Sequence, residues 1–135
     1  MPPELGNLAG LQVLNLGGNE LSGAIPTQLG ALNKLAWLDL SHNQLSGSIP
    51  PDLGKLAALE VLHLGINQLS GHIPPQLGDL SALTHLYLNF NKLDGGPKKN
   101  ESVSAWRRRL KSELVEQKQA EEKSNQSVPA WRRWL

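Results

Sequence analysis

Leucines recur along most of the chain with a period of 24 residues. The segment from Leu11 to Pro26 reads LQVLNLGGNELSGAIP, and the same order of leucines, asparagine, glycine and Ile-Pro returns from Leu35 and from Leu59, and partly from Leu83. Each unit contains a Leu-x-Leu segment in which apolar and variable residues alternate, which is typical of a half-buried strand. A strict period of this length predicts a solenoid in which each unit packs against its neighbours.

The pattern predicts four parallel strands, and it also predicts how each unit turns after its strand. The strands are centred on Leu14, Leu38, Leu62 and Leu86. A glycine follows each strand at Gly23, Gly47, Gly71 and Gly95, where we expect turn conformations that a Cβ would oppose. The Ile-Pro pairs favour extended backbone and exclude long helices, so the opposite, convex side should carry extended segments and short helical turns.

The repeat LxxLxLxxNxLSGxIPxxLGxL, over residues 2–95, resembles the plant-type leucine-rich repeat of receptor ectodomains and secreted inhibitor proteins. The resemblance implies an α/β fold, a right-handed leucine-rich-repeat solenoid, followed here by a C-terminal helical tail. Residues 1–95 are expected to form the array and residues 96–135 the tail. Residues 2–10 match residues 50–58, so the first unit is incomplete, and the paired-cysteine cap of the family is absent. Both features suggest a fragment, an exon-shuffled product or a partial gene model.

One asparagine per unit stands where the chain leaves the strand, and backbone groups lose their ladder partners there. These residues are Asn19, Asn43, Asn67 and Asn91. An amide both donates and accepts hydrogen bonds, so we interpret them as a structural ladder rather than as ligand contacts.

The variable residues between the inward leucines should lie on the concave strand face, in columns about 4.8 Å apart. One column holds Val13, Trp37, Val61 and His85; the next holds Asn15, Asp39, His63 and Tyr87; a third holds Gly17, Ser41, Gly65 and Asn89. Exposed aromatic residues are enriched at binding hot spots, which makes Trp37 and Tyr87 candidate anchors. The candidate ligand-binding set is Trp37, Asp39, Val61, His63, His85, Tyr87 and Asn89.

Catalytic and cofactor chemistry finds little support in the sequence. Signatures for nucleotide binding, zinc proteases and serine hydrolases are absent. Asp39, His63 and Tyr87 should be neighbours, but an open sheet excludes no water and offers no nucleophile, so a solvated hydrogen-bond ladder is favoured over catalysis. A His63–His85 metal pair lacks further ligands. We therefore expect no cofactor, no metal and no enzyme activity.

The tail contains a duplication of its own, because residues 100–110 (NESVSAWRRRL) and residues 125–135 (NQSVPAWRRWL) agree at eight of eleven positions. Its candidate motif residues are Trp106, Arg107, Arg108, Trp131, Arg132 and Arg133. Residues 102–123 are predicted to form a helix, N-capped by Ser102 or Ser104, with a narrow apolar stripe. We expect the first motif to cap the fourth repeat and the second to remain free for a partner; a disordered tail is the alternative.

Charge and composition limit which partners and which cell compartment we expect for the chain. The chain has a formal net charge of +1, and its tail holds ten Lys and Arg residues against five glutamates, too few for strong binding to nucleic acid or membranes. It has no cysteine, no membrane-spanning apolar run and no signal peptide, so it should be intracellular as written, although the resembled family is often extracellular.

The sequence therefore predicts a monomeric, non-enzymatic module that binds a protein or peptide, and no small-molecule substrate, on the concave face. The first alternative is a ligand-sensing fragment of a larger receptor or signalling protein, whose kinase or GTPase part lies outside this chain. An enzyme acting through Asp39, His63 and Tyr87 is a third and weaker alternative.

Overall fold

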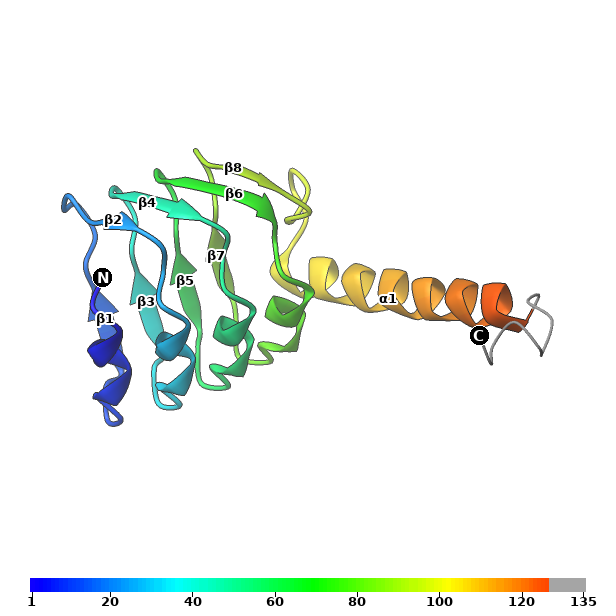
Figure 1. Cartoon of the computed structure of the whole chain (residues 1–135), viewed down its shortest axis with the longest axis horizontal. Helices are drawn as coiled ribbons and strands as arrows, with labels where there is room; N and C mark the ends of the chain where they lie inside the picture. Colours follow the sequence, from blue (N-terminus) through cyan, green and yellow to red (C-terminus); the bar gives the residue numbers. More distant parts are fainter. Residues whose placement is uncertain (127–135) are drawn as a thin grey trace, which may run out of the picture.

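A computed structural model describes residues 1–126 of the chain. Four repeat units stack side by side, and a single long helix leaves the stack after the fourth unit (Figure 1). The predicted leucine-rich-repeat solenoid with a helical tail is confirmed. No helix within residues 1–126 has the length and apolar character needed to cross a bilayer.

The Leu-x-Leu segments form one parallel sheet with the order β1-β3-β5-β7. Its strands are β1 (Val13–Asn15), β3 (Trp37–Asp39), β5 (Val61–His63) and β7 (His85–Tyr87). The register places residues 24 apart directly opposite each other, as Leu14, Leu38, Leu62 and Leu86 illustrate. The period of the sequence is therefore the period of the sheet.

The segments that follow each strand pair as well, whereas the leucine pattern predicts only extended backbone there. They form a second parallel sheet, composed of β2 (Ser22–Gly23), β4 (Gln44–Gly47), β6 (Gln68–His72) and β8 (Lys92–Asp94). Gly23, Gly47, Gly71 and Gly95 have φ values of 78°, 77°, 84° and 86°, in the left-handed region that favours glycine. The prediction of turn conformations at these four positions is confirmed.

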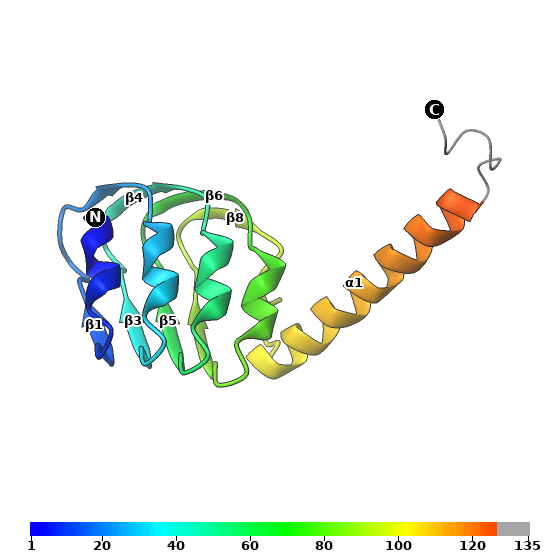
Figure 2. The same cartoon turned by 60° about the horizontal axis from the view of Figure 1, so that its bottom comes forward.

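Short 3-10 helices complete each unit on the side away from the first sheet (Figure 2). They are η1 (Pro3–Asn7), η2 (Thr27–Ala31), η3 (Pro51–Lys55) and η4 (Pro75–Asp79). Each begins just after a proline with extended backbone, since proline fixes φ and removes the amide donor. These are the short helical turns expected on the convex side.

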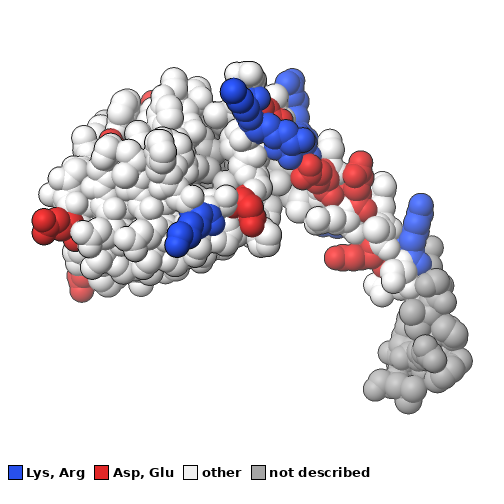
Figure 3. All heavy atoms as spheres, turned by 90° about the horizontal axis from the view of Figure 1, so that it is seen from above, with Lys and Arg blue, Asp and Glu red and all other residues white. Residues whose placement is uncertain are grey.

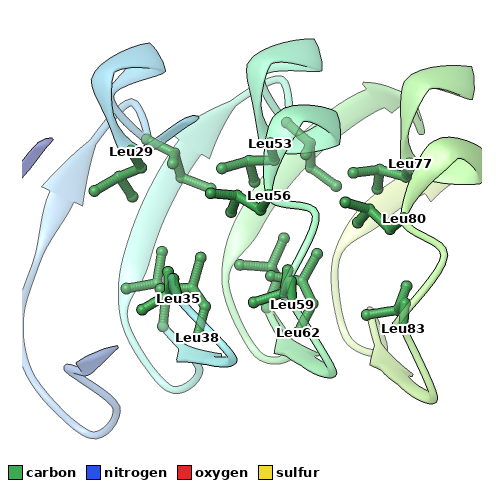
Figure 4. Packing of buried hydrophobic residues seen from close by; sticks show 14 of the residues in the cluster. Leu29, Leu35, Leu38, Leu53, Leu56, Leu59, Leu62, Leu77, Leu80 and Leu83 are labelled. Atoms are coloured by element: carbon green, nitrogen blue, oxygen red, sulfur yellow. The ribbon is translucent and has the colours of Figure 1, made fainter. Parts of the chain in front are cut away.

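The core is a column of leucines enclosed by the two sheets and the 3-10 helices (Figure 4). Leucines of the central units, such as Leu38 and Leu62, are completely buried. Burial falls toward the N-terminal unit, where Leu5 and Leu11 are half-buried and Leu8 is 50% exposed. Within residues 1–126 no strand lies beside β1 on its outer edge, so the apolar side chains of this unit are covered from one side only.

The repeat asparagines join neighbouring units by the same set of hydrogen bonds each time. The amide nitrogen of Asn43 donates to the carbonyls of Leu16, Leu40 and Ser41 at 3.0, 3.1 and 3.1 Å. Its Oδ1 accepts from the amide of Leu21 at 3.0 Å. Asn67 and Asn91 repeat this arrangement one and two units later. Asn19 is exposed and bonds only within its own unit, because no described unit precedes it in the stack.

The helix α1 (Val103–Gln126) packs against the stack only through its first turns. Ser102 caps it, since its Oγ accepts a hydrogen bond from the amide of Ala105 at 3.1 Å. Trp106 is completely buried in the core cluster, and its indole nitrogen donates to the carbonyl of Gly95 at 3.1 Å. From Val115 to Asn125 every side chain is exposed, and the helix points away from the repeats (Figures 1 and 2).

Candidate functional site: the strand face

The strand face is the solvent side of β1, β3, β5 and β7. It presents the first two columns of residues that the 24-residue period predicts. Val13, Trp37, Val61 and His85 lie in register across the four strands, and Asn15, Asp39, His63 and Tyr87 form the next column. Trp37 is 45% exposed and Tyr87 is 42% exposed. Two large aromatic side chains therefore stand on the strand face, two strands and one column apart.

The polar residues of the second column bond to their own turns. Asp39 Oδ1 accepts from the amide and the hydroxyl of Ser41 at 2.9 and 2.6 Å. His63 Nδ1 accepts from the amide of Gly65 at 3.3 Å, and Asn15 accepts from Gly17 at 3.0 Å. The expected hydrogen-bond ladder between Asp39, His63 and Tyr87 is absent from the described bonds. Asn15, Asp39 and His63 each bond instead to the backbone two residues further along.

Tyr87 breaks this pattern and joins a small aromatic cluster. Its ring centroid lies 4.8 Å from the imidazole of His63 and 6.1 Å from that of His85. His85 Nδ1 lies 2.9 Å from the hydroxyl of Thr84. The cluster offers aromatic area together with imidazole nitrogens, a combination suited to contacts that are partly apolar and partly polar.

The third column (Gly17, Ser41, Gly65 and Asn89) was expected to face solvent, but most of it does not. Ser41 is 5% exposed and Gly65 is buried, because the chain already bends inward at this position. A Cβ on Gly65 would come within 2.9 Å of Asn89 Oδ1, so the Asn89 side chain lies against that glycine. Among Ser41, Gly65 and Asn89, which belong to the second, third and fourth units, only Asn89 is exposed.

A fourth column, one residue further on, is not predicted by the leucine pattern. It contains Gly18, His42, Ile66 and Phe90, all with φ between 54° and 70°. Ile66 is 37% exposed and Phe90 is 76% exposed. A left-handed conformation is uncommon for a β-branched residue, and nothing in a leucine pattern signals it, since glycine occupies only one of these four positions. These four residues are also 24 positions apart, so applying the same period to the position after the third column could have revealed this column.

No group of three or more His, Cys, Asp or Glu residues within residues 1–126 is arranged to hold a metal ion. Asp39 Oδ1 accepts two hydrogen bonds from Ser41, and no described hydrogen bond joins Asp39 to His63.

The first tail motif is occupied in holding α1 against the fourth unit. Trp106 is buried, Arg107 donates to the carbonyl of Leu80, and only Arg108 of this motif is exposed. Trp106 is therefore a packing residue, in the place expected for a cap on the fourth repeat. Trp131, Arg132 and Arg133 of the second motif lie outside the described residues.

A shielded ion pair fixes the start of this helix. The guanidinium of Arg109 donates to both carboxylate oxygens of Glu101, at 2.9 and 3.0 Å. These hydrogen bonds, together with one from the backbone amide of Lys98, lower the pKa of Glu101 to about 2. The repeats themselves carry few charges, whereas charged residues are dense along α1 and at its junction with the repeats (Figure 3).

Comparison with known proteins agrees with this architecture. Residues 4–45 and residues 58–80 match family models described as leucine rich repeat. The chain is a leucine-rich-repeat protein, and its repeats are of the plant type. No curated protein matches the sequence.

Solved structures of plant proteins share both the fold and much of the sequence. The structure of PEPR1-AtPEP1 is 47% identical with a TM-score of 0.68, and the match covers 69% of this chain and 13% of that one. The Arabidopsis receptor kinase HAESA, in complex with the peptide hormone IDA and the co-receptor SERK1, is 43% identical with a TM-score of 0.66, covering 68% and 15%. A plant ice-binding protein is 42% identical with a TM-score of 0.66, covering 68% and 30%. The chain thus spans less than a third of the length of each of these proteins.

Proposed function

We propose that the chain is a non-enzymatic module that binds a protein or peptide on its strand face. The observation that carries this proposal is the pair of exposed aromatics, Trp37 and Tyr87, at repeat positions that the core does not use. Aromatic side chains supply large contact area at low entropic cost and are enriched among hot spots. HAESA, a similar structure, is in complex with a peptide hormone, which supports a ligand of this class.

The anchors divide the face into two parts. Trp37 lies beside Val13 and Val61, which provide an apolar surround. Tyr87 lies beside His63 and His85, and the exposed Phe90 and Ile66 extend the apolar area at that end. We infer that a ligand crosses the strands, with Val61, His63, His85 and Asn89 as surrounding contacts.

The same observations fit a second context, in which this stretch is the sensing part of a larger receptor or signalling protein. The proteins it resembles include a receptor kinase, and the chain covers 15% of that structure. Both contexts use the strand face in the same way, so they make the same prediction for the residues involved. The similar ice-binding protein illustrates that the fold alone does not choose the ligand.

Differential capture tests the proposal for a partner of any identity. The full chain, a Trp37→Ala/Tyr87→Ala double variant and an Asp52→Ala control on the 3-10 helix side would serve as baits in parallel. We expect a protein that is captured by the first and third baits and lost from the second. Capture that depends on Asp52 and not on the two aromatics would contradict the assigned face.

A further inference from the structure

The outer edge of the fourth unit presents, uncovered, the surface that earlier units use to bind the next strand. In the interior, the carbonyl of Ala36 accepts from the amides of Glu60 and Val61, and the amides of Leu40 and His42 donate to His63 and Gly65. The equivalent groups of the fourth unit are the carbonyl of Thr84 and the amides of Leu88 and Phe90. None of the three has a hydrogen-bond partner among the described residues.

Apolar side chains beside this edge are also only partly covered by the described residues. Leu86, Leu88 and Leu93 are half-buried, whereas their equivalents Leu62, Leu64 and Leu69 are completely buried. Together with Ile73, Gly96 and Pro97 they line a cavity of about 470 Å³. Each internal unit fills the corresponding space with leucines of the following strand.

Helix α1 closes only one side of this end. Leu110 Cδ2 lies 3.0 Å from the position that a Cβ on Gly78 would take, whereas Gly30 and Gly54 instead face the carbonyls of Asp52 and Gln76 in the next 3-10 helix. The first turns of α1 therefore occupy the place of a following 3-10 helix. No residue of α1 lines the 470 Å³ cavity, so the edge of β7 stays open beside it.

We propose that this edge binds one extended peptide strand, parallel to β7, that carries two leucine-like side chains two residues apart. The chemistry of the occupant follows from the interface that the chain itself builds three times, at β1–β3, β3–β5 and β5–β7. Its backbone supplies the missing donors and acceptors, and its alternate side chains enter the cavity, as in strand addition to a sheet edge. A complete further unit does not fit, because α1 stands where its 3-10 helix would lie.

This site is separate from the strand face, although Tyr87 and Asn89 line both. The face binds through exposed side chains, whereas the edge binds through backbone groups and the buried side of the sheet. A Trp37→Ala change, which removes one proposed anchor of the face, should leave the edge unaffected. Failure of either proposal can therefore be recognised independently of the other.

A titration of the isotope-labelled full chain, followed by NMR, tests the proposal. The probe is a synthetic peptide with the sequence of residues 59–67, LEVLHLGIN, and the control peptide has serine in place of the leucines at positions 62 and 64. We expect the amide signals of Leu88 and Phe90 to shift and their hydrogen exchange to slow. The serine peptide should bind at least roughly tenfold more weakly.

Two chain variants sharpen the result. Leu88→Asp should abolish the peptide-induced shifts, and Val13→Asp, an exposed valine at the opposite end of the same sheet, should retain them. If Leu88→Asp does not fold, the comparison of the two peptides still decides. Absence of shifts at residues 84–93, shifts confined to residues 12–17, or equal binding of the serine peptide would overturn the proposal. So would shifts of Leu88 and Phe90 that depend on protein concentration alone, because a second copy of the chain would then cover the edge.

Discussion

The glycine of the Leu-Gly pair in each 3-10 helix sets how closely neighbouring units approach. A Cβ on Gly30 would lie 2.5 Å from the carbonyl oxygen of Asp52, and one on Gly54 would lie 2.6 Å from that of Gln76. These contacts involve backbone, which cannot rotate away as a side chain can. Stacking of the 3-10 helices therefore requires glycine at this position, independently of any turn conformation.

Gly54→Ala is expected to destabilise the stack, because η3 and η4 must separate to admit the methyl group. Overpacking of this kind typically costs about 1–3 kcal/mol. Gly10→Ala is the matched control, since a Cβ there meets nothing within 4 Å. Thermal unfolding followed by circular dichroism should show a lower Tm for Gly54→Ala alone, and equal Tm values for the two variants would contradict this account.

For single residues, the sequence predicts the conformations and hydrogen bonds that recur in every unit. It does not predict those that belong to one residue in one unit. The asparagine hydrogen bonds and the four turn glycines follow from position alone. The bonds of Asp39 and His63 to their own turns could not be predicted from position. A polar residue on a strand can bond across strands or along its own chain, and the sequence does not distinguish the two. The left-handed conformation of Ile66 was not predicted either, because a β-branched residue rarely adopts it.

Among the elements, the start of α1 depends on residues that the second copy of the tail motif lacks. The two copies of the tail motif differ at three positions, and two of these are Glu101 and Arg109, which become Gln126 and Trp134 in the second copy. Glu101 and Arg109 form the ion pair at the start of α1. The duplication was visible in the sequence, but the importance of its differences became visible only with the fold.

Neutralising Glu101 should weaken the docking of α1 in a pH-dependent way. The pKa of Glu101 is lowered from 4.5 to about 2, so the carboxylate stabilises the folded state above pH 4.5, and this contribution is lost as the pH falls toward 2. Glu101→Gln should therefore have a lower Tm than the parent chain near neutral pH, and the difference should shrink between pH 4.5 and pH 2. Glu116→Gln, an exposed change on the same helix, is the control. A constant difference across this pH range would show that charge is not the cause.

For the whole molecule, the fold divides into a stack that holds itself together and a helix that closes one side of its end. The leucine period predicted the stack and the apolar stripe predicted the helix, but neither could fix how far the helix stays in contact. That limit depends on geometry, because α1 leaves the stack at an angle and its side chains from Val115 to Asn125 are exposed.

Removing residues 98–135 should lower the stability of the repeats, since Trp106 leaves the core and η4 loses its cover. Loss of a buried tryptophan costs about 3–5 kcal/mol before compensation, which corresponds to a fall in Tm of roughly 10 °C or more. A shorter truncation of residues 118–135 keeps every described turn of α1 that packs on the repeats, and it should leave the Tm nearly unchanged. Equal melting of the parent chain and the longer truncation would mean that α1 is only a tether.

The central claim is that the strand face binds the partner through Trp37 and Tyr87, and the dissociation constant of the captured partner tests it most directly. Trp37→Ala and Tyr87→Ala should each weaken binding by about 1–3 kcal/mol, roughly 5- to 150-fold in Kd, with almost no change in Tm because both side chains are exposed. Asp52→Ala should bind as the parent chain does. Unchanged Kd values for both aromatic variants, or a loss of affinity matched by a loss of Tm, would contradict the account.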